Sequence, residues 1–331
     1  MRTVVLLCLL LLLLPACGRE RPSAQPPPPA APGEEEDPLG AFEEEELSGR
    51  IQVDGSSTVA PLMTLAAERF RRAEPKVRVS VGVSGTGGGF ERFCRGETDL
   101  SNASREIKQE ERELCAKNGV SFFELQVAND GISVVVNKAN TWAKCLTVDK
   151  LKAIWAPGSK VKTWKDVDDS YPAEKLSLYG PGTDSGTFDY FTEAIVGEEG
   201  SSRSDFTPTE NDNVIVTGVA GDKGGLGYFG LSYYLENRNR LNALEIDAGD
   251  DCIEPSIETV QDGSYTPLSR PLFVYVNEDK LADKPAIDPF LTFILDNEPA
   301  LARGAKFVPM QPDQIERERT VLESGGVGTK D

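Results

Sequence analysis

The feature that most constrains the fold of this chain is a repeated succession of strand, polar loop and helix. Residues 51–53 alternate between apolar and polar, residues 77–83 carry valine at every second position, and residues 99–102 form a short third strand and turn. A loop rich in Ser, Thr and Gly follows each strand, and helical patterns come next, as in the helix predicted from Phe90 to about Arg95. This rhythm predicts an α/β fold with mostly parallel strands.

The length and two isolated apolar strands indicate two lobes. A chain of 331 residues is long enough for two domains of ordinary size. The apolar runs at 134–136 and 273–276 are each followed by a polar break that contains Asn, and two such strands can carry the chain between lobes and back. We therefore expect a first lobe at 50–131, a second at 132–270, and a segment at 271–331 that completes the hinge and the first lobe.

The N-terminus has the pattern of an export signal. Arg2 precedes an uninterrupted apolar run at residues 4–14, which is too short to span a bilayer and is typical of a signal peptide. Cys17 follows the run and resembles the lipidated cysteine of bacterial lipoproteins, so residues 1–16 are expected to be removed and Cys17 to anchor the protein to the membrane. Ordinary signal cleavage nearby is the alternative. Residues 17–49, rich in Pro and Glu, are expected to be a disordered tether.

The charge and the missing histidine exclude several classes of function. Lys and Arg number 35 against 54 Asp and Glu, which gives a net charge of −19 and argues against nucleic acid as a partner. With no histidine, a Ser-His-Asp triad, a Cys-His pair and a histidine zinc site are all impossible. A bound anion must then be held by local dipoles and a few well-placed cations.

Four cysteines remain if Cys8 is removed with the signal and Cys17 is acylated. An exported protein is oxidised, so these four suit two disulfides, for which three connectivities are possible. We favour Cys94–Cys115, which flanks one βα excursion, and Cys145–Cys252, which joins distant segments of one lobe. Zinc is the alternative, but the chain has no CxxC spacing, and we expect no metal.

Four polar loops carry the functional signal. At least three precede predicted helices, where the first turn exposes free N–H groups and the positive end of the helix dipole. Any one of them could be explained as a helix cap and a turn. In an open α/β sheet, however, the carboxyl ends of the strands converge on one crevice, so four such loops together predict an anion site. The loops are Ser56-Ser57-Thr58, Ser84-Gly85-Thr86-Gly87, Ser101-Asn102-Ala103-Ser104-Arg105 and Ser185-Gly186-Thr187.

The expected ligand contacts follow from these loops. Hydroxyls and amides donate hydrogen bonds, glycines allow close approach, and Arg105 neutralises charge unless it is merely a solvated arginine. Asp54 and Asp99 end strands beside the loops, and a carboxylate there would accept the proton of monohydrogen phosphate, which sulfate lacks; capping or ion pairing is the alternative. The expected contacts are Ser57, Thr58, Ser84, Gly85, Thr86, Gly87, Ser104, Arg105, Ser185, Gly186 and Thr187.

Catalysis is not expected from these residues. Ser185 adjoins Asp184, but no histidine is available as its base and no Ser-x-x-Lys motif is present. The GxxxxGK[ST] pattern of a nucleotide-binding loop is also absent. No cofactor is predicted.

Five motifs in order resemble the phosphate-binding proteins of Pst-type ABC importers. The resemblance runs from about Arg50 to about Pro309. The motifs are Asp54 to Val59, Ser84 to Phe90, Asp99 to Arg105, Gly182 to Phe188 and Gly218 to Tyr228.

The resemblance implies a type II periplasmic binding protein fold, with two α/β lobes that are joined by a two-crossover hinge and close on the ligand. It implies dehydrated inorganic phosphate held at Thr58, Thr86 and Ser185-Gly186-Thr187, and delivery to an ABC importer permease. This chain departs from the pattern of some members at two points. It lacks an arginine just before Ser185, and Ser104-Arg105 stands where those members carry an aspartate.

The sequence therefore predicts a monomeric, exported lipoprotein that binds phosphate reversibly and is not an enzyme. A binder of another oxyanion, such as sulfate, molybdate or tungstate, or of a carboxylate is the first alternative. A phosphatase-type enzyme that shares the loops is the second. A surface sensor or adhesin with the same fold is the third.

Overall fold

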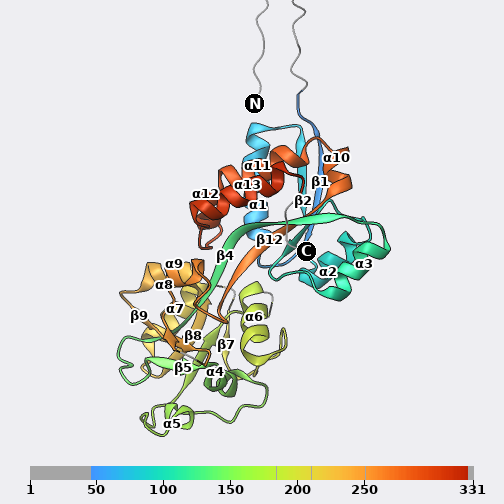
Figure 1. Ribbon diagram of the computed structural model, residues 1–331. Coiled ribbons are helices and arrows are strands. Elements are labelled where there is room, and N and C mark those ends of the chain that lie inside the picture. Colours follow the sequence, from blue (N-terminus) through green and yellow to red (C-terminus); the bar gives the residue numbers. More distant parts are fainter. Residues whose placement is uncertain (1–45, 184, 210, 250, 327–331) are drawn as a thin grey trace, which may run out of the picture. The chain divides into compact units, whose positions relative to one another are not determined.

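The computed structural model describes residues 46–183, 185–209, 211–249 and 251–326 (Figure 1). The predicted signal peptide, Cys17 and nearly all of the predicted tether lie outside the described residues, as does Asp184. No helix in the described ranges is long and apolar enough to cross a membrane.

One long mixed sheet runs through the folded part. Its strand order is β2-β1-β3-β12-β4-β8-β6-β7, with β9 paired to β4, and β11-β10-β5 form a small separate sheet. The strands are β1 (Gly49–Gly55), β2 (Val77–Val81), β3 (Leu100–Ala103), β4 (Phe122–Asn137), β5 (Cys145–Thr147), β6 (Ser177–Gly180), β7 (Thr207–Pro208), β8 (Gly225–Gly230), β9 (Leu241–Ala243), β10 (Glu245–Asp247), β11 (Cys252–Ile253) and β12 (Ser269–Asn277).

The prediction of mostly parallel strands was wrong in the middle of the sheet. Strands β1, β2 and β3 are parallel, as are β6, β7 and β8, and these belong to the strand–loop–helix units. The long strands β4 and β12 instead pair antiparallel with each other, and both pair antiparallel with their other neighbours in the sheet. They are crossing strands rather than members of a strand–loop–helix unit, so the local rhythm carried no information about their direction.

Strands β4 and β12 pass side by side from one lobe to the other (Figure 1). On β4, the residues up to Ala128 pack in one core and those from Ile132 onward pack in another. On β12, Leu268 just before the strand belongs to the second core, while Leu272 belongs to the first. The two strands therefore exchange cores at the same level, and this level is the hinge.

In the first lobe, helices cover both faces of the sheet. Helix α1 packs with the C-terminal helices over one face, and α2 and α3 enclose a smaller core with Tyr275 on the other. Helix α2 begins at Gly85, five residues before the predicted start, so its glycine-rich N-terminus is helical. The helices are α1 (Ala60–Ala73), α2 (Gly85–Phe93), α3 (Gln109–Lys117), α10 (Glu278–Asp283), α11 (Ile287–Asp296), α12 (Glu298–Gly304) and α13 (Pro312–Glu323).

The second lobe is built in the same layered way. Its main core buries Trp155, Trp164 and Tyr228 completely, and a smaller core packs α7 on the opposite face. The helices are α4 (Val148–Trp155), α5 (Trp164–Val167), α6 (Gly186–Phe191), a π-helical turn (Thr192–Val196), α7 (Asp212–Gly221), α8 (Leu231–Asn237) and α9 (Ile257–Gln261).

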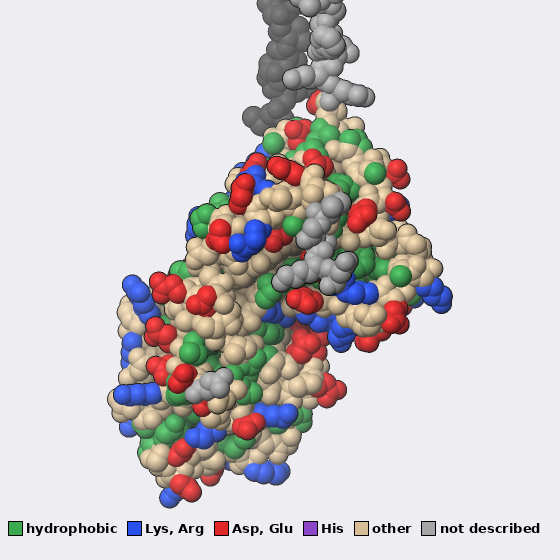
Figure 2. All heavy atoms as spheres, in the orientation of Figure 1, with side chains coloured by type: hydrophobic (Ala, Val, Ile, Leu, Met, Phe, Trp, Pro, Cys, Tyr) green, Lys and Arg blue, Asp and Glu red, His purple; other side chains and the backbone are tan. Residues whose placement is uncertain are grey.

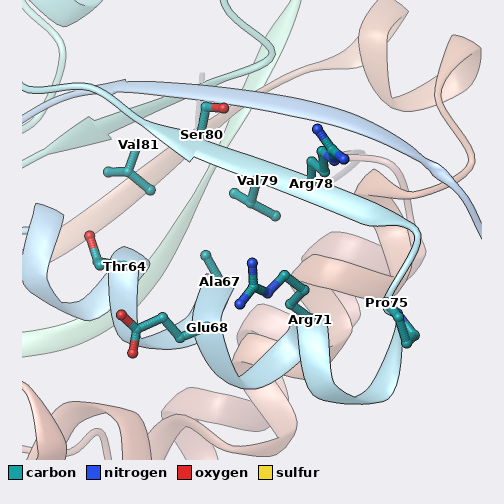
Figure 3. A pocket seen from close by; sticks show the side chains of 9 residues that line it. All are labelled: Thr64, Ala67, Glu68, Arg71, Pro75, Arg78, Val79, Ser80 and Val81. Atoms are coloured by element: carbon teal, nitrogen blue, oxygen red, sulfur yellow. The ribbon is translucent and has the colours of Figure 1, made fainter. Parts of the chain in front are cut away.

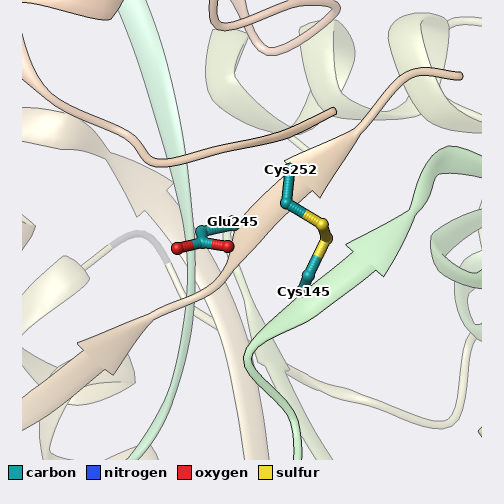
Figure 4. Close-up of side chains that lie close together, drawn as sticks. All are labelled: Cys145, Glu245 and Cys252. Carbon is teal, nitrogen blue, oxygen red and sulfur yellow. A yellow bond between two sulfur atoms is a disulfide. The ribbon is translucent and has the colours of Figure 1, made fainter. Parts of the chain in front are cut away.

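Both favoured disulfides are confirmed. Cys94–Cys115 joins α2 to α3, and Cys145–Cys252 joins two strands of the small sheet. Within the described ranges, Cys145, Cys252 and Glu245 are the one group close enough to share a metal ion. Figure 4 shows the two sulfur atoms bonded to each other beside Glu245, so neither is a free thiolate that could ligate a metal.

Candidate anion-binding site

A small enclosed cavity of about 30 Å³ lies between the loops of the two lobes. This volume suits a compact ion rather than a sugar or a peptide. Its walls come from both lobes and from β12, one of the two crossing strands. The lining residues are Ser56, Ser57, Thr58, Gly85, Thr86, Gly87, Ser104, Arg105, Gly186, Asp189, Tyr190, Glu193, Glu199 and Arg270.

The first-lobe wall consists of polar loops at the ends of β1, β2 and β3. Helix α2 begins at Gly85, whose φ of +75° suits glycine. The first turn of this helix, with its free N–H groups and the positive end of the helix dipole, lines the cavity. The hydroxyls of Thr86 and Ser104 lie 3.0 Å apart, and the Ser104 amide donates to Thr86 Oγ1 at 3.3 Å. The loops therefore hold one another in position before any ligand arrives.

The two lobes are in contact at Gly186, in the wall of the cavity. Thr58 Oγ1 donates to the carbonyl oxygen of Gly186 at 3.3 Å. A Cβ atom at Gly186 would lie 2.4 Å from Thr58 Oγ1 and 2.7 Å from Thr58 N, closer than real Cβ contacts. Glycine is thus required at this position by the opposite lobe, and not by its own backbone conformation.

Arg270, which the sequence reasoning missed, is the central cation of the cavity. Its Nη2 donates to Thr58 Oγ1 at 3.0 Å and its Nη1 to the Ser104 carbonyl at 3.1 Å, while its guanidinium lies 3.5 Å from the centre of the Tyr190 ring. Burial lowers its pKa, and Asp130 opposes that shift. The available sequence signal was its place: Arg270 is the last residue of the predicted second lobe, at the boundary with the segment that completes the hinge.

Arg105 lines the cavity as predicted, but its charge is already partly compensated. Both of its terminal nitrogens donate to the Glu111 carboxylate at 2.8 Å. Its guanidinium also lies 5.6 Å from the centre of the Phe90 ring. The hydrogen bond to Glu111 raises the pKa of Arg105.

The second-lobe wall carries the carboxylates Asp189, Glu193 and Glu199. Burial raises the pKa of Asp189 to about 6, Glu199 adds to the shift, and Arg270 and a hydrogen bond from Ser57 oppose it. Asp189 lies in the first turns of α6, directly after the predicted Ser185-Gly186-Thr187 loop. No feature of the sequence indicated that this residue faces the opposite lobe.

Three predicted donors, Ser84, Ser185 and Thr187, do not line the cavity. Ser84 donates to Asp54 Oδ1 at 2.9 Å. Ser185 caps its helix by accepting the Thr187 amide at 3.2 Å. Both serines therefore support the loops from behind, whereas eight of the predicted contacts do line the cavity: Ser57, Thr58, Gly85, Thr86, Gly87, Ser104, Arg105 and Gly186.

Neither predicted proton acceptor faces the cavity. Asp54 forms an ion pair with Arg92 and accepts the Gly55 amide. Asp99 pairs with Lys284 at 2.7 Å and accepts the Gln52 amide at 2.8 Å. The structure thus corrects the expectation: ion pairing, the alternative considered for both residues, is what their side chains do.

A larger hollow lies elsewhere, between α1 and the edge strand β2. It has a volume of about 750 Å³ and is open to solvent along the edge strand β2. Figure 3 shows Val79 and Val81 of β2 facing Ala67 of α1, with Arg71 and Glu68 at the rim. This groove lacks the converging loops and amides of the enclosed cavity, so its size alone does not make it the anion site.

The comparisons with known proteins agree with this geometry. A PBP superfamily domain matches residues 40–298. Protein SphX of Synechococcus elongatus is 46% identical over 263 residues, which cover 78% of this chain and 77% of that protein. The phosphate-binding protein PstS of Staphylococcus saprophyticus is 39% identical over 276 residues, which cover 83% of this chain and 85% of that protein. The chain belongs to the PstS family of the PBP superfamily.

A solved structure supports membership of the PstS family. A possible phosphate-binding protein from Planctomyces limnophilus is 44% identical and superposes with a TM-score of 0.80, covering 84% of this chain and 99% of its own. The predicted type II periplasmic binding protein fold is thereby confirmed. PstS-family proteins are solute-binding proteins that act outside the cytoplasm. Figure 2 shows Asp and Glu side chains interspersed with Lys and Arg over the visible face.

Proposed function

We propose that this protein binds inorganic phosphate reversibly and delivers it to an ABC importer. The observation that carries the proposal is the enclosed cavity in which hydroxyls, amides and the buried cation Arg270 converge from both lobes. A small tetrahedral anion has four oxygens and can accept hydrogen bonds from many such donors at once. The names of the PstS relatives support phosphate as that anion.

The ligand contacts we propose combine the predicted loops with Arg270. Ser57, Thr58, Thr86 and Ser104 donate through hydroxyls or adjacent amides. Gly85, Gly87 and Gly186 admit the anion to the backbone, and Arg105 and Arg270 supply positive charge. Ser84, Ser185 and Thr187 support these loops.

Asp189 is our candidate for the group that distinguishes phosphate from sulfate. It lines the cavity, and its carboxylate is held there by a hydrogen bond from Ser57. Monohydrogen phosphate has a proton to donate to a carboxylate, whereas sulfate at neutral pH would place its oxygens against an acceptor with nothing between them. Asp189 takes the place that Asp54 and Asp99 had in the sequence prediction.

The remaining proposals concern processing and organisation. We propose that Cys17 is the lipid anchor, that residues 17–49 are the tether, and that the protein acts as a monomer without catalysis. The proposed lobes are 50–131 and 132–270, with 271–331 completing the hinge and the first lobe. The change of core between Ala128 and Ile132 supports the first of these boundaries.

Isothermal titration of the soluble domain with phosphate, and then with sulfate in competition, tests the main proposal. We expect one phosphate per chain and at least a hundredfold weaker response to sulfate, roughly the discrimination that one unpaired buried polar group gives. Tight sulfate binding with no phosphate response would show that the protein serves another oxyanion. Hydrolysis of a phosphomonoester by the purified protein would contradict the absence of catalysis.

A further inference from the structure

The hinge contains a buried pair of opposite charges, of which Asp130 is not among the residues that line the cavity. Asp130 on β4 and Arg270 on β12 are register partners at the level where the two strands exchange cores. Arg270 Nε lies 3.5 Å from Asp130 Oδ2, and the side chains are only 10% and 8% exposed. A charged pair at this depth is costly to bury, so its presence at the hinge calls for a functional reason.

The surroundings of Arg270 tie the pair to both lobes. Two of its nitrogens donate hydrogen bonds to Thr58 and Ser104 of the first lobe, and its guanidinium group stacks on the ring of Tyr190 in the second lobe. The Tyr190 hydroxyl in turn donates to the Pro267 carbonyl at 2.7 Å, just before β12. Arg270 is therefore fixed on every side, and its Nε is left without a hydrogen bond, facing Asp130.

The arrangement makes Asp130 a competitor of the bound anion. Among the described residues, Asp130 is the one carboxylate that forms an ion pair with Arg270. An anion in the cavity meets the same guanidinium from the other side, so it must share a charge that Asp130 already balances. The more completely Asp130 neutralises the charge of Arg270, the less binding free energy the anion gains from that arginine.

We infer that Asp130 is a positioning residue that holds Arg270 at the hinge and serves as its counter-ion in the empty site, and thereby limits phosphate affinity. The inference rests on the proposed function, since phosphate is the anion that competes. An affinity kept below its maximum suits a protein that must hand its ligand on, because release from a binding protein is governed mainly by the dissociation rate.

The test is Asp130→Asn in the full folded domain, with phosphate as the titrant. The amide keeps the size of the side chain but removes its charge, so Arg270 loses the carboxylate with which it is paired. We expect phosphate to bind about tenfold more tightly and to dissociate more slowly, the change expected for coupled neighbouring charges. The melting temperature of the ligand-free protein should fall, and the rise that phosphate causes should be larger than in the wild type.

The matched control is Glu298→Gln, another neutral substitution of a buried carboxylate. Glu298 accepts a hydrogen bond from the Met310 amide at 3.0 Å and does not line the cavity. The phosphate affinity of the Glu298→Gln variant should therefore equal that of the wild type. Wild-type or weaker phosphate binding by Asp130→Asn would overturn the inference, because a merely structural carboxylate gives that result.

A double variant keeps the test decisive if Asp130→Asn folds poorly. Asp130→Asn combined with Arg270→Gln removes both charges and should recover thermal stability relative to the single variant. Failure to recover it would also overturn the inference, because the two residues would not act as a unit. Absence of any phosphate binding by the wild-type protein is a separate result that contradicts the proposed function, and the stability comparison does not depend on it.

Discussion

The two walls of the cavity are built from opposite kinds of chemistry. The first-lobe wall presents hydroxyls, amides and glycines from three loops, and its cation Arg105 is paired with Glu111. The second-lobe wall presents one glycine, one tyrosine and three carboxylates, of which Asp189 reaches Ser57 across the gap. Arg270 lies on the hinge between the two walls and donates hydrogen bonds to the first.

The difference indicates how an acidic protein can hold an anion and still choose among anions. Neutral donors in the first lobe stabilise negative charge without relying on the net field of the molecule. Acceptors in the second lobe disfavour any anion that has no proton to offer them. Under the proposed function, we expect affinity to depend on the first wall and the hinge, and selectivity to depend on the second wall.

The largest effect should come from keeping the walls apart. Gly186→Ala places a methyl group within 2.9 Å of three Thr58 atoms, so the lobes cannot close to the observed distance. We expect phosphate binding to weaken by about a hundredfold, in line with the cost of overpacking a tight contact. Titration calorimetry measures the change. Gly221→Ala is the control, since a Cβ there meets no atom within 4 Å, and equal losses in both variants would contradict the role of the Thr58 contact.

The next effect concerns selectivity. Asp189→Asn replaces a pure acceptor by a side chain that can also donate, so sulfate should gain and the preference for phosphate should fall by about thirtyfold. Competition titrations with both anions give the ratio directly. An unchanged ratio would assign discrimination to another residue, with Glu193 and Glu199 as the remaining carboxylates of that wall.

A smaller effect is expected from the cation of the first wall. Arg105→Gln should weaken phosphate binding by about fivefold, because Glu111 already balances much of the Arg105 charge. The comparison variant Arg270→Gln should cost more, about thirtyfold, because that cation is buried. Dissociation constants of the two variants, measured at the same ionic strength, decide the order, and a larger loss for Arg105→Gln would reverse our view of the two arginines.

The smallest effect is a pH dependence of the ligand-free protein. The folded-state pKa of Asp189 is raised to about 6, so the folded protein binds this proton more tightly than the unfolded chain does. Its stability should therefore fall as the pH rises from 4 to 6 and stay lower above that range. We expect the difference in melting temperature between Asp189→Asn and the wild type to be about 1 to 2 °C more favourable to the variant at pH 8 than at pH 5. Glu298 and Glu318 also have raised pKa values near 7, so the wild-type profile must be subtracted.

Much of the first wall could be predicted from the sequence because its signals are local. A strand end, glycine and hydroxyl residues and a helix start are neighbours in the chain, and they identified Thr58, Thr86 and Ser104. The disulfides also followed from the chain, through the small number of cysteines and the segments that each pair would join.

Asp54 and Asp99 show where this reasoning stops. Both stand beside loops that line the cavity, but the direction of a carboxylate depends on which cation lies nearby, and Arg92 and Lys284 belong to distant segments. The same limit hid Asp189, which follows the predicted Ser185-Gly186-Thr187 loop by two residues but interacts with Ser57 of the opposite lobe.

The sequence by itself determined the α/β class, the polar loops of an anion site and the cysteine pairs, because periodicity, helix starts and cysteine number are properties of short segments. Only the tertiary structure decided that Arg270 is the buried cation, that Asp130 balances it and that Gly186 must lack a side chain. Each of these depends on distances between the two lobes or between the crossing strands, and those distances arise only when the folded chain brings remote segments together.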